Sequence, residues 1–283
     1  MSQKIKIISD STSDLTPALC EQYGISIVPL TVTLGTESFL DGVTIQPDRL
    51  YAYYTQHKAL PKTAAPTPVD FQNEFQKWTA QGYDVICFTI SSDFSASYTN
   101  ACLAAEGMRG VYIVDSRNLS TGVGLQVLRA AEWAAQGVPT EELIQRLAAL
   151  PAKVEASFII NTLEFLWKGG RCSGVAALGA NVLRLKPCIE VIDGKMSVGK
   201  KFRGDLTSCV KNYVRQRLEN RTDIDTSRIF ITHSGMTDPA DVEAARCAIE
   251  QCMHFDEILE THANCTVCTH CGPNTLGVLF IRK

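Results

Sequence analysis

Polar turns follow four of the strands that the sequence predicts, and each turn offers hydroxyls, carboxylates or an imidazole. They lie at Asp10–Asp14, Ser91–Tyr98, Asp115–Gly124 and His233–Gly235. Because the carboxyl ends of parallel strands line the crevice of an open sheet, we expect these turns to converge. Hydroxyls and the free N–H groups at helix starts bind anions. The sequence therefore predicts an anion site, although helix capping is the commoner use of any single turn of this kind.

The turn from Ser91 to Ser97, which includes Ser92 and Ser95, is the strongest candidate because it carries four hydroxyls. Motifs of several enzyme classes are missing from the sequence. There is no GxxxxGK[ST] phosphate loop and no GxSxG hydrolase elbow, and the glycines after the fourth turn lack the third glycine of a dinucleotide fingerprint. These absences favour a hydroxyl-lined anion pocket over an enzyme active site.

Two basic segments are candidates for contact with an anion. Lys168–Arg171 ends a predicted helix and places two glycines beside a fixed positive charge. Two interpretations of this segment are about equally good: it caps the helix C-terminus, or it takes part in binding the anion. Lys200–Arg203 follows a predicted hairpin, and its default interpretation is a solvated surface.

A cluster of thiols and an imidazole near the C-terminus raises the question of zinc. Cys265, Cys268, His270 and Cys271 crowd into seven residues that we predict as a strand running into a turn. Structural zinc sites draw on two separated ligand pairs, and residues three apart on a strand face opposite sides. We therefore expect no metal here and interpret most of the eleven cysteines as small buried hydrophobic residues.

The order of predicted elements indicates the fold class. Strands alternate with helices in the first half, which is typical of parallel βαβ units, although a β-rich run at Ile25–Leu34 is followed by what reads as the end of a hairpin at Val43–Ile45. In the second half, Asp193-Gly194 predicts a type I′ hairpin between two strands within residues 188–198. We predict two α/β domains: residues 1–152 with a mostly parallel sheet and flanking helices, and residues 153–283 with a mixed sheet and helices.

Composition limits the partners. The chain has 283 residues and a net charge of −3, which argues against nucleic acid or an anionic membrane as a partner. No signal-peptide pattern opens the sequence, and no apolar run reaches the ~18 residues that span a bilayer. We expect a cytoplasmic protein without stable membrane insertion.

Taken together, the motifs resemble the DegV family from Ile5 to Ile281. The resemblance is carried by seven segments in register: 7–15, 63–68, 91–101, 114–124, 163–171, 186–195 and 270–273. The sequence departs from the family pattern at three motifs: it has Ala64-Ala65 for Ser-Gln, Ser95-Ala96-Ser97 for Ser-Gly-Thr, and His270-Cys271-Gly272-Pro273-Asn274 for His-Thr-Gly-Pro-Gly.

The resemblance implies a long-chain fatty acid, palmitate-like or oleate-like, as the bound ligand, with no other cofactor. It implies that Thr63 and Ser95 hold the carboxylate, with His270 and Arg203 nearby. Ser92, the backbone N–H of Ala96 and, at the kinase-facing side, Arg171 complete the expected head-group site. Some family members present the bound acid to a separate fatty-acid kinase, so such a kinase is an expected partner.

Physical chemistry is consistent with this implication, because each buried methylene contributes roughly 0.8 kcal/mol and a sixteen-carbon chain roughly 12 kcal/mol before binding costs. We therefore expect a lipid-binding carrier in fatty acid metabolism or lipid transport that is not itself an enzyme. Two alternatives stay open: a phosphotransferase or hydrolase that uses His270, and a thiol or zinc protein built on the C-terminal cysteines.

Overall fold

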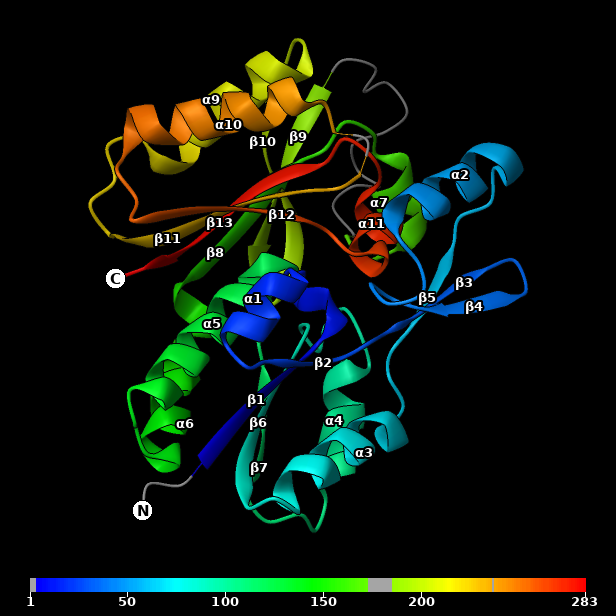
Figure 1. Ribbon diagram of the computed structural model, residues 1–283. Helices are drawn as coiled ribbons and strands as arrows, with labels where there is room; N and C mark the ends of the chain where they lie inside the picture. The colour runs from blue at the N-terminus through cyan, green and yellow to red at the C-terminus, as the bar shows by residue number, and fades with distance from the viewer. Residues whose placement is uncertain (1–3, 173–184, 236) are drawn as a thin grey trace.

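A computed structural model describes residues 4–172, 185–235 and 237–283 (Figure 1). Two main sheets lie one above the other in the view of Figure 1, and a small third sheet lies to the side. The lower sheet is parallel and has the strand order β2 (Ser26–Val28), β1 (Lys4–Asp10), β6 (Tyr83–Thr89) and β7 (Val111–Asp115).

Helices cover both faces of the parallel sheet because its strands are apolar on both sides. Ile8 packs with the helices on one face, and its neighbour Ile7 packs on the other, as alternation along a strand requires. The first face carries α3 (Pro68–Thr79) and α4 (Ser97–Ala105). The second face carries α5 (Thr121–Ala135), α6 (Thr140–Ala149) and the short helix α1 (Pro17–Gln22). Two short 3-10 helices, η1 (Ser11–Ser13) and η2 (Pro151–Lys153), follow β1 and α6, respectively.

Helix α5 joins the two main sheets. Its apolar residues share one core cluster with β1 and β6 below and with Ala156 and Leu279 of the upper sheet. All but five of its fifteen residues are buried, which fits a helix covered on two sides. The turns at the carboxyl ends of the parallel strands therefore face the second half of the chain.

The upper sheet is mixed and has six strands. Their order is β10 (Lys195–Arg203), β9 (Leu185–Ile192), β8 (Val154–Ile159), β13 (Leu276–Arg282), β11 (Ile224–His233) and β12 (Glu257–His262). Only β11 and β12 run parallel. Helices α9 (Leu206–Leu218) and α10 (Pro239–Cys252) cover one face. Asp193 and Gly194, both with positive φ, connect β9 to β10 and confirm the predicted hairpin.

The third sheet corrects one reading of the sequence. The run Ile25–Leu34 is not one strand but two, because β2 ends before Pro29, whose ring nitrogen has no hydrogen to donate to a ladder. The chain then enters a second sheet with the order β4 (Glu37–Leu40), β3 (Thr31–Leu34) and β5 (Lys62–Ala64). Val43–Ile45 lies in the turn after β4 instead of ending a hairpin strand.

The C-terminal cysteines require a second correction. Cys265–Cys271 forms helix α11 instead of a strand, and it packs against α7 (Glu164–Gly169) and α2 (Pro47–His57). In a helix, residues three apart share one face, and all three cysteines of α11 are buried. The thiols follow a packed helix face, which the short apolar–polar alternation of the sequence did not reveal.

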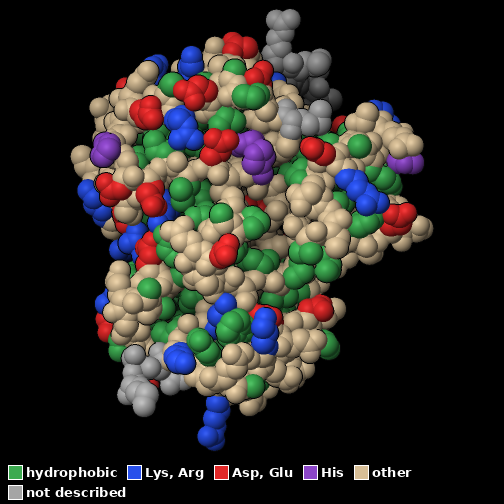
Figure 2. Space-filling model, viewed as in Figure 1, with side chains coloured by type: hydrophobic (Ala, Val, Ile, Leu, Met, Phe, Trp, Pro, Cys, Tyr) green, Lys and Arg blue, Asp and Glu red, His purple; other side chains and the backbone are tan. Residues whose placement is uncertain are grey.

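The predicted fold class is confirmed, with a parallel sheet in the first half and a mixed sheet in the second. The division at residues 152 and 153 stays a prediction. No helix among the described residues combines the length and apolar character needed to cross a bilayer. Charged side chains of both signs are scattered over the face shown in Figure 2, and a hollow lies between the third sheet and the rest of the molecule.

Candidate ligand-binding site

A cavity of about 230 Å³ lies where the third sheet, the turn after β6 and helix α11 meet. Polar groups stand at only a few places on its wall: Thr63, Ser95, Arg171, Thr266 and His270. The remaining lining is apolar and comes from both halves of the chain: Leu30, Ala64, Ala65, Ile90, Phe94, Ala96, Leu119, Met196, Val267 and Cys271.

The structure brings most of the predicted site residues together. Thr63, Ser95, Ala96, His270 and Arg171 all line this cavity, although Thr63 and His270 are 207 positions apart. The five residues come from four places in the fold: the edge strand β5, the turn into α4 (both Ser95 and Ala96), helix α11, and the position after the C-cap of α7.

Two predicted residues lie elsewhere. Ser92 is exposed, and its side chain accepts a hydrogen bond of 3.3 Å from Arg117 while its N–H donates to Asp115. Arg203 is exposed at the end of β10, opposite Leu185 in the hairpin. Neither residue is part of the cavity wall.

The hydroxyls of the polar turns are mostly used inside the protein. Ser91 donates to the carbonyl of Gly194, and Ser120 donates to Asp14. The hydroxyls of Thr121 and Thr232 lie 2.6 Å apart and join the two halves. The turns do converge, but within the Ser91–Ser97 turn only Ser95 offers a hydroxyl to the cavity wall.

Thr63 and His270 form the central polar pair. Thr63 Oγ1 lies 2.9 Å from His270 Nε2. Burial, aided by the nearby positive charge of Arg171, lowers the pKa of His270 to about 4. The imidazole is therefore neutral at pH 7, so one ring nitrogen carries a proton and the other a lone pair.

The surroundings of the ring decide which nitrogen carries the proton. His270 Nδ1 is buried without a hydrogen-bond partner and lies next to Gly169, where an added Cβ would come within 2.8 Å of it. An unpaired buried N–H is less tolerable than an unpaired acceptor, so we place the proton on Nε2. Nε2–H then donates to Thr63 Oγ1, which leaves the hydroxyl hydrogen of Thr63 free to point into the cavity.

Ser95 and Arg171 complete the polar wall. Ser95 Oγ accepts from the N–H of Ser97 at 3.2 Å and lies 3.3 Å from the Ser97 hydroxyl, at the start of α4. The Arg171 guanidinium donates to the carbonyl of Gly169 at 2.8 Å. No acidic residue lines the cavity among the described parts of the chain, so the wall suits an anion.

Asp10, at the end of β1, fixes the turn that precedes α4. It is fully buried and accepts hydrogen bonds from the N–H and hydroxyl of Thr12 and, at 3.0 Å, from the N–H of Ile90. Burial raises the pKa of Asp10 to about 6, although these donors act in the opposite direction. The carboxylate thereby ties β1 to the end of β6, one residue before the turn that carries Ser95.

Asp14 and Asp41 hold helix α11 in place. Asp14 accepts from the N–H of Asn264 at 2.8 Å, and Asp41 accepts from the N–H of Thr266 at 3.1 Å. Both carboxyls are buried, which raises their pKa values above the usual range. Sequence reasoning read Asp14 only as a turn residue and passed over Asp41, because their partners lie more than 200 residues away.

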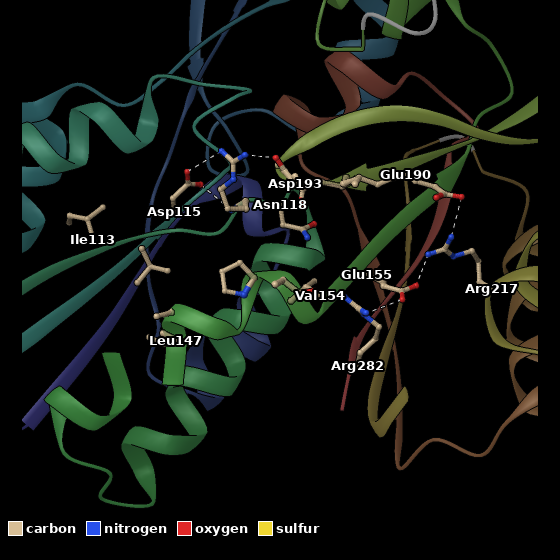
Figure 3. Close-up of a pocket in the computed structure, with 18 of the residues that line it drawn as sticks. Ile113, Asp115, Asn118, Leu147, Val154, Glu155, Glu190, Asp193, Arg217 and Arg282 are labelled. Atoms are coloured by element: carbon tan, nitrogen blue, oxygen red, sulfur yellow. Dashed lines mark hydrogen bonds and ion pairs between the residues drawn. The ribbon is translucent and has the colours of Figure 1, made fainter. Parts of the chain in front are cut away.

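A larger cavity of about 980 Å³ lies between β7 and strands β8 and β9 of the upper sheet (Figure 3). Its wall includes four arginines and four acidic residues, so their formal charges cancel. Arg217 pairs with Glu155 at 2.6 Å and with Glu190 at 3.1 Å, and Arg282 lies 3.4 Å from Glu155. Because these guanidiniums already have carboxylate partners, the smaller cavity is the better anion site.

Gly169 gives the site a direct test. A Cβ at this position would lie 2.8 Å from His270 Nδ1, so Gly169→Ala is expected to displace the ring and its bond to Thr63. We expect about 1–3 kcal/mol lower stability, measured by chemical unfolding. Gly170→Asn is the matched control, since Gly170 has φ +68° with open space around it and Asn tolerates that conformation. If Gly169→Ala and Gly170→Asn lowered the stability equally, Gly169 would not be needed to make room for the His270 ring.

Comparison with known proteins places the chain in a family. The family model described as "Uncharacterised protein, DegV family" matches residues 4–283. A DegV domain-containing protein of Deinococcus radiodurans is 32% identical over 281 residues, which cover 97% of each chain. A fatty-acid-binding DegV family protein of Thermus thermophilus shares 29% identity and a TM-score of 0.89, over 99% of this chain and 100% of that one.

A stearic-acid-binding protein of Eubacterium ventriosum is similar as well, with 26% identity and a TM-score of 0.84 over 99% of this chain and 98% of that one. The family model and the relatives cover nearly the whole sequence, as the motif order predicted. The chain therefore belongs to the DegV family.

Proposed function

We propose that the protein binds one long-chain fatty acid, with the carboxylate held by the hydroxyls of Thr63 and Ser95 and the acyl chain buried. The observation that carries the proposal is the Thr63–His270 pair. A neutral imidazole turns the Thr63 hydroxyl into a donor that faces a mostly apolar cavity. The similarity to proteins described as binding fatty acids supports the same ligand class.

The apolar interior offers a path for the acyl chain. A narrow second cavity of about 30 Å³ shares Leu119, Val267 and Cys271 with the first. We propose that the chain follows this apolar wall between α11 and the upper sheet. Burial of each methylene there contributes roughly 0.8 kcal/mol, so the hydrocarbon supplies most of the affinity and the head group supplies orientation.

The proposed role is that of a cytoplasmic carrier in lipid transport or fatty acid metabolism, with no catalysis of its own. The exposed Arg171 marks the mouth at which a separate kinase would reach the carboxylate. The alternative, a phosphotransferase or hydrolase that uses His270, is less well supported. One ring nitrogen of His270 bonds to Thr63 and the other packs against Gly169, so neither is open to a substrate.

The experiment is extraction and reloading. Protein purified from cells should release a long-chain fatty acid in mass spectrometry of the organic extract, at close to one per chain. Delipidated protein should take up palmitate or oleate with the same stoichiometry. Octanoate should bind far more weakly, because it buries fewer methylenes. An extract without acyl chains, together with no uptake of either acid, would refute the proposal.

A further inference from the structure

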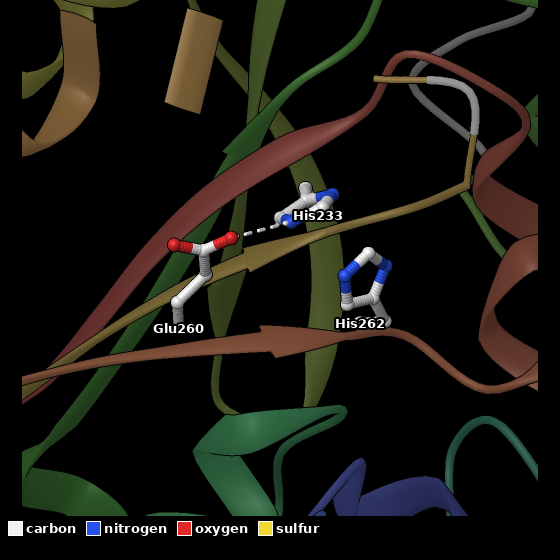
Figure 4. Close-up of side chains that lie close together, drawn as sticks. All are labelled: His233, Glu260 and His262. Carbon is white, nitrogen blue, oxygen red and sulfur yellow. Dashed lines mark hydrogen bonds and ion pairs between the residues drawn. The ribbon is translucent and has the colours of Figure 1, made fainter. Parts of the chain in front are cut away.

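Three side chains at the ends of β11 and β12 form a cluster outside the head-group cavity (Figure 4), although His233 also lines the narrow second cavity. His233 and His262 are direct partners in the parallel ladder, and Glu260 lies two residues before His262 on the same strand face. One donor atom from each lies within 4.8 Å of the other two. Within the described ranges, this is the one group of three with such spacing.

The geometry within the cluster resembles that of a metal site. His233 Nε2 lies 3.3 Å from Glu260 Oε1. Two ligands of a tetrahedral zinc ion, each ~2.0–2.1 Å from the metal, lie roughly 3.3–3.4 Å apart. Glu260 and His262 are exposed, and the third donor, on His262, lies within 4.8 Å of the other two.

The environment of the cluster supports the same conclusion. His233 is only 5% exposed, and its Nε2, the ring nitrogen that faces Glu260, is the atom that would bind the ion. Arg246 holds the second oxygen of Glu260 at 3.1 Å, which fixes the carboxylate and leaves Oε1 facing His233.

We propose that His233, Glu260 and His262 form a binding site for a divalent transition metal of the zinc class. Two imidazoles and one carboxylate are a ligand set that zinc accepts, with water in the fourth position. The site ties the ends of β11 and β12 together at the point where the chain leaves β12 for helix α11. It is separate from the lipid head-group site and does not depend on the proposed function.

The test is titration of the reduced full chain with cobalt(II) followed by visible absorption, with zinc as competitor. We expect one cobalt per chain and no intense thiolate charge-transfer band, since the proposed ligands are nitrogen and oxygen. His262→Ala is expected to weaken binding by at least ~10-fold. His254→Ala is the matched control, because His254 is exposed and lies outside the cluster.

Zinc should also raise the midpoint of thermal unfolding in the wild type and in the control, but not in His262→Ala. The proposal is overturned by any of three results: no cobalt binding, equal affinity in both histidine variants, or a thiolate band, which would assign the metal to the cysteines. Circular dichroism of each variant shows whether it is folded. Glu260→Gln provides a second variant that keeps the side-chain shape and should bind cobalt more weakly than the wild type.

Discussion

The Asp10→Asn variant is expected to lose about 2–4 kcal/mol of unfolding free energy. Oδ1 accepts from the N–H and hydroxyl of Thr12, and Oδ2 accepts from the N–H of Ile90, all in the buried interior. An amide has only one oxygen. Whichever way it turns, its NH₂ group faces a backbone N–H, and one buried donor is left unpaired.

Asp14→Asn is the matched control for this prediction. Asp14 is equally buried, but Oδ2 accepts from the Ser120 hydroxyl, which can rotate and accept from an amide instead. Its pKa lies well above the usual range because of burial, so the amide replaces a carboxyl that is readily neutral. Asparagine also tolerates the φ of +51° at this position. Urea unfolding at pH 7 should show a large loss for residue 10 and a small one for residue 14; the reverse order would contradict the hydrogen-bond argument.

The Thr63→Val variant is expected to bind palmitate roughly 10- to 150-fold more weakly than the wild type. Valine keeps the branched shape that suits strand β5 but lacks the hydroxyl. The variant loses the donor to the carboxylate, a hydrogen bond to a charged group that is worth about 1.5–3 kcal/mol. It also leaves the buried N–H of His270 without its acceptor.

Thr63→Ser separates the hydroxyl from the methyl group. It should retain affinity to within a few-fold, because the hydroxyl can still accept from His270 and donate to the ligand. Isothermal titration of delipidated protein measures both variants, and thermal unfolding without ligand shows that each is folded. If Thr63→Val binds as tightly as Thr63→Ser, the hydroxyl is not a head-group donor.

Much of the fold could be predicted from local patterns. The hairpin at Asp193-Gly194 and the alternation of strands with helices in the first half depend on neighbours in the sequence, and both are present. The break at Pro29 could have been predicted as well, because proline cannot donate to a strand ladder. The helix at Cys265–Cys271 could not be predicted with the same methods, because it depends on packing against distant segments, which overrides short-range alternation.

The site residues, too, divide into those that local sequence motifs predicted and those that depend on contacts between distant segments. Motif order pointed to Thr63, Ser95, Ala96, Arg171 and His270, which line one cavity. The apolar residues that line the cavity could not be predicted from the sequence, because any buried hydrophobic side chain could have been one of them. Nor did the sequence suggest that Gly169 must lack a side chain to make room for an imidazole from α11. That contact exists only after two remote helices have packed.

The position of β13 has a consequence for biosynthesis. This strand follows every other strand of its sheet in the sequence, yet it lies in the interior, between β8 and β11. Strand β13 is synthesised more than a hundred residues after β8. Until then one edge of β8 has no partner strand, and it can form hydrogen bonds with a wrong strand. Helix α11 immediately precedes β13, so a nascent chain cannot complete the proposed head-group site, which includes His270, until most of the second half of the molecule has been made.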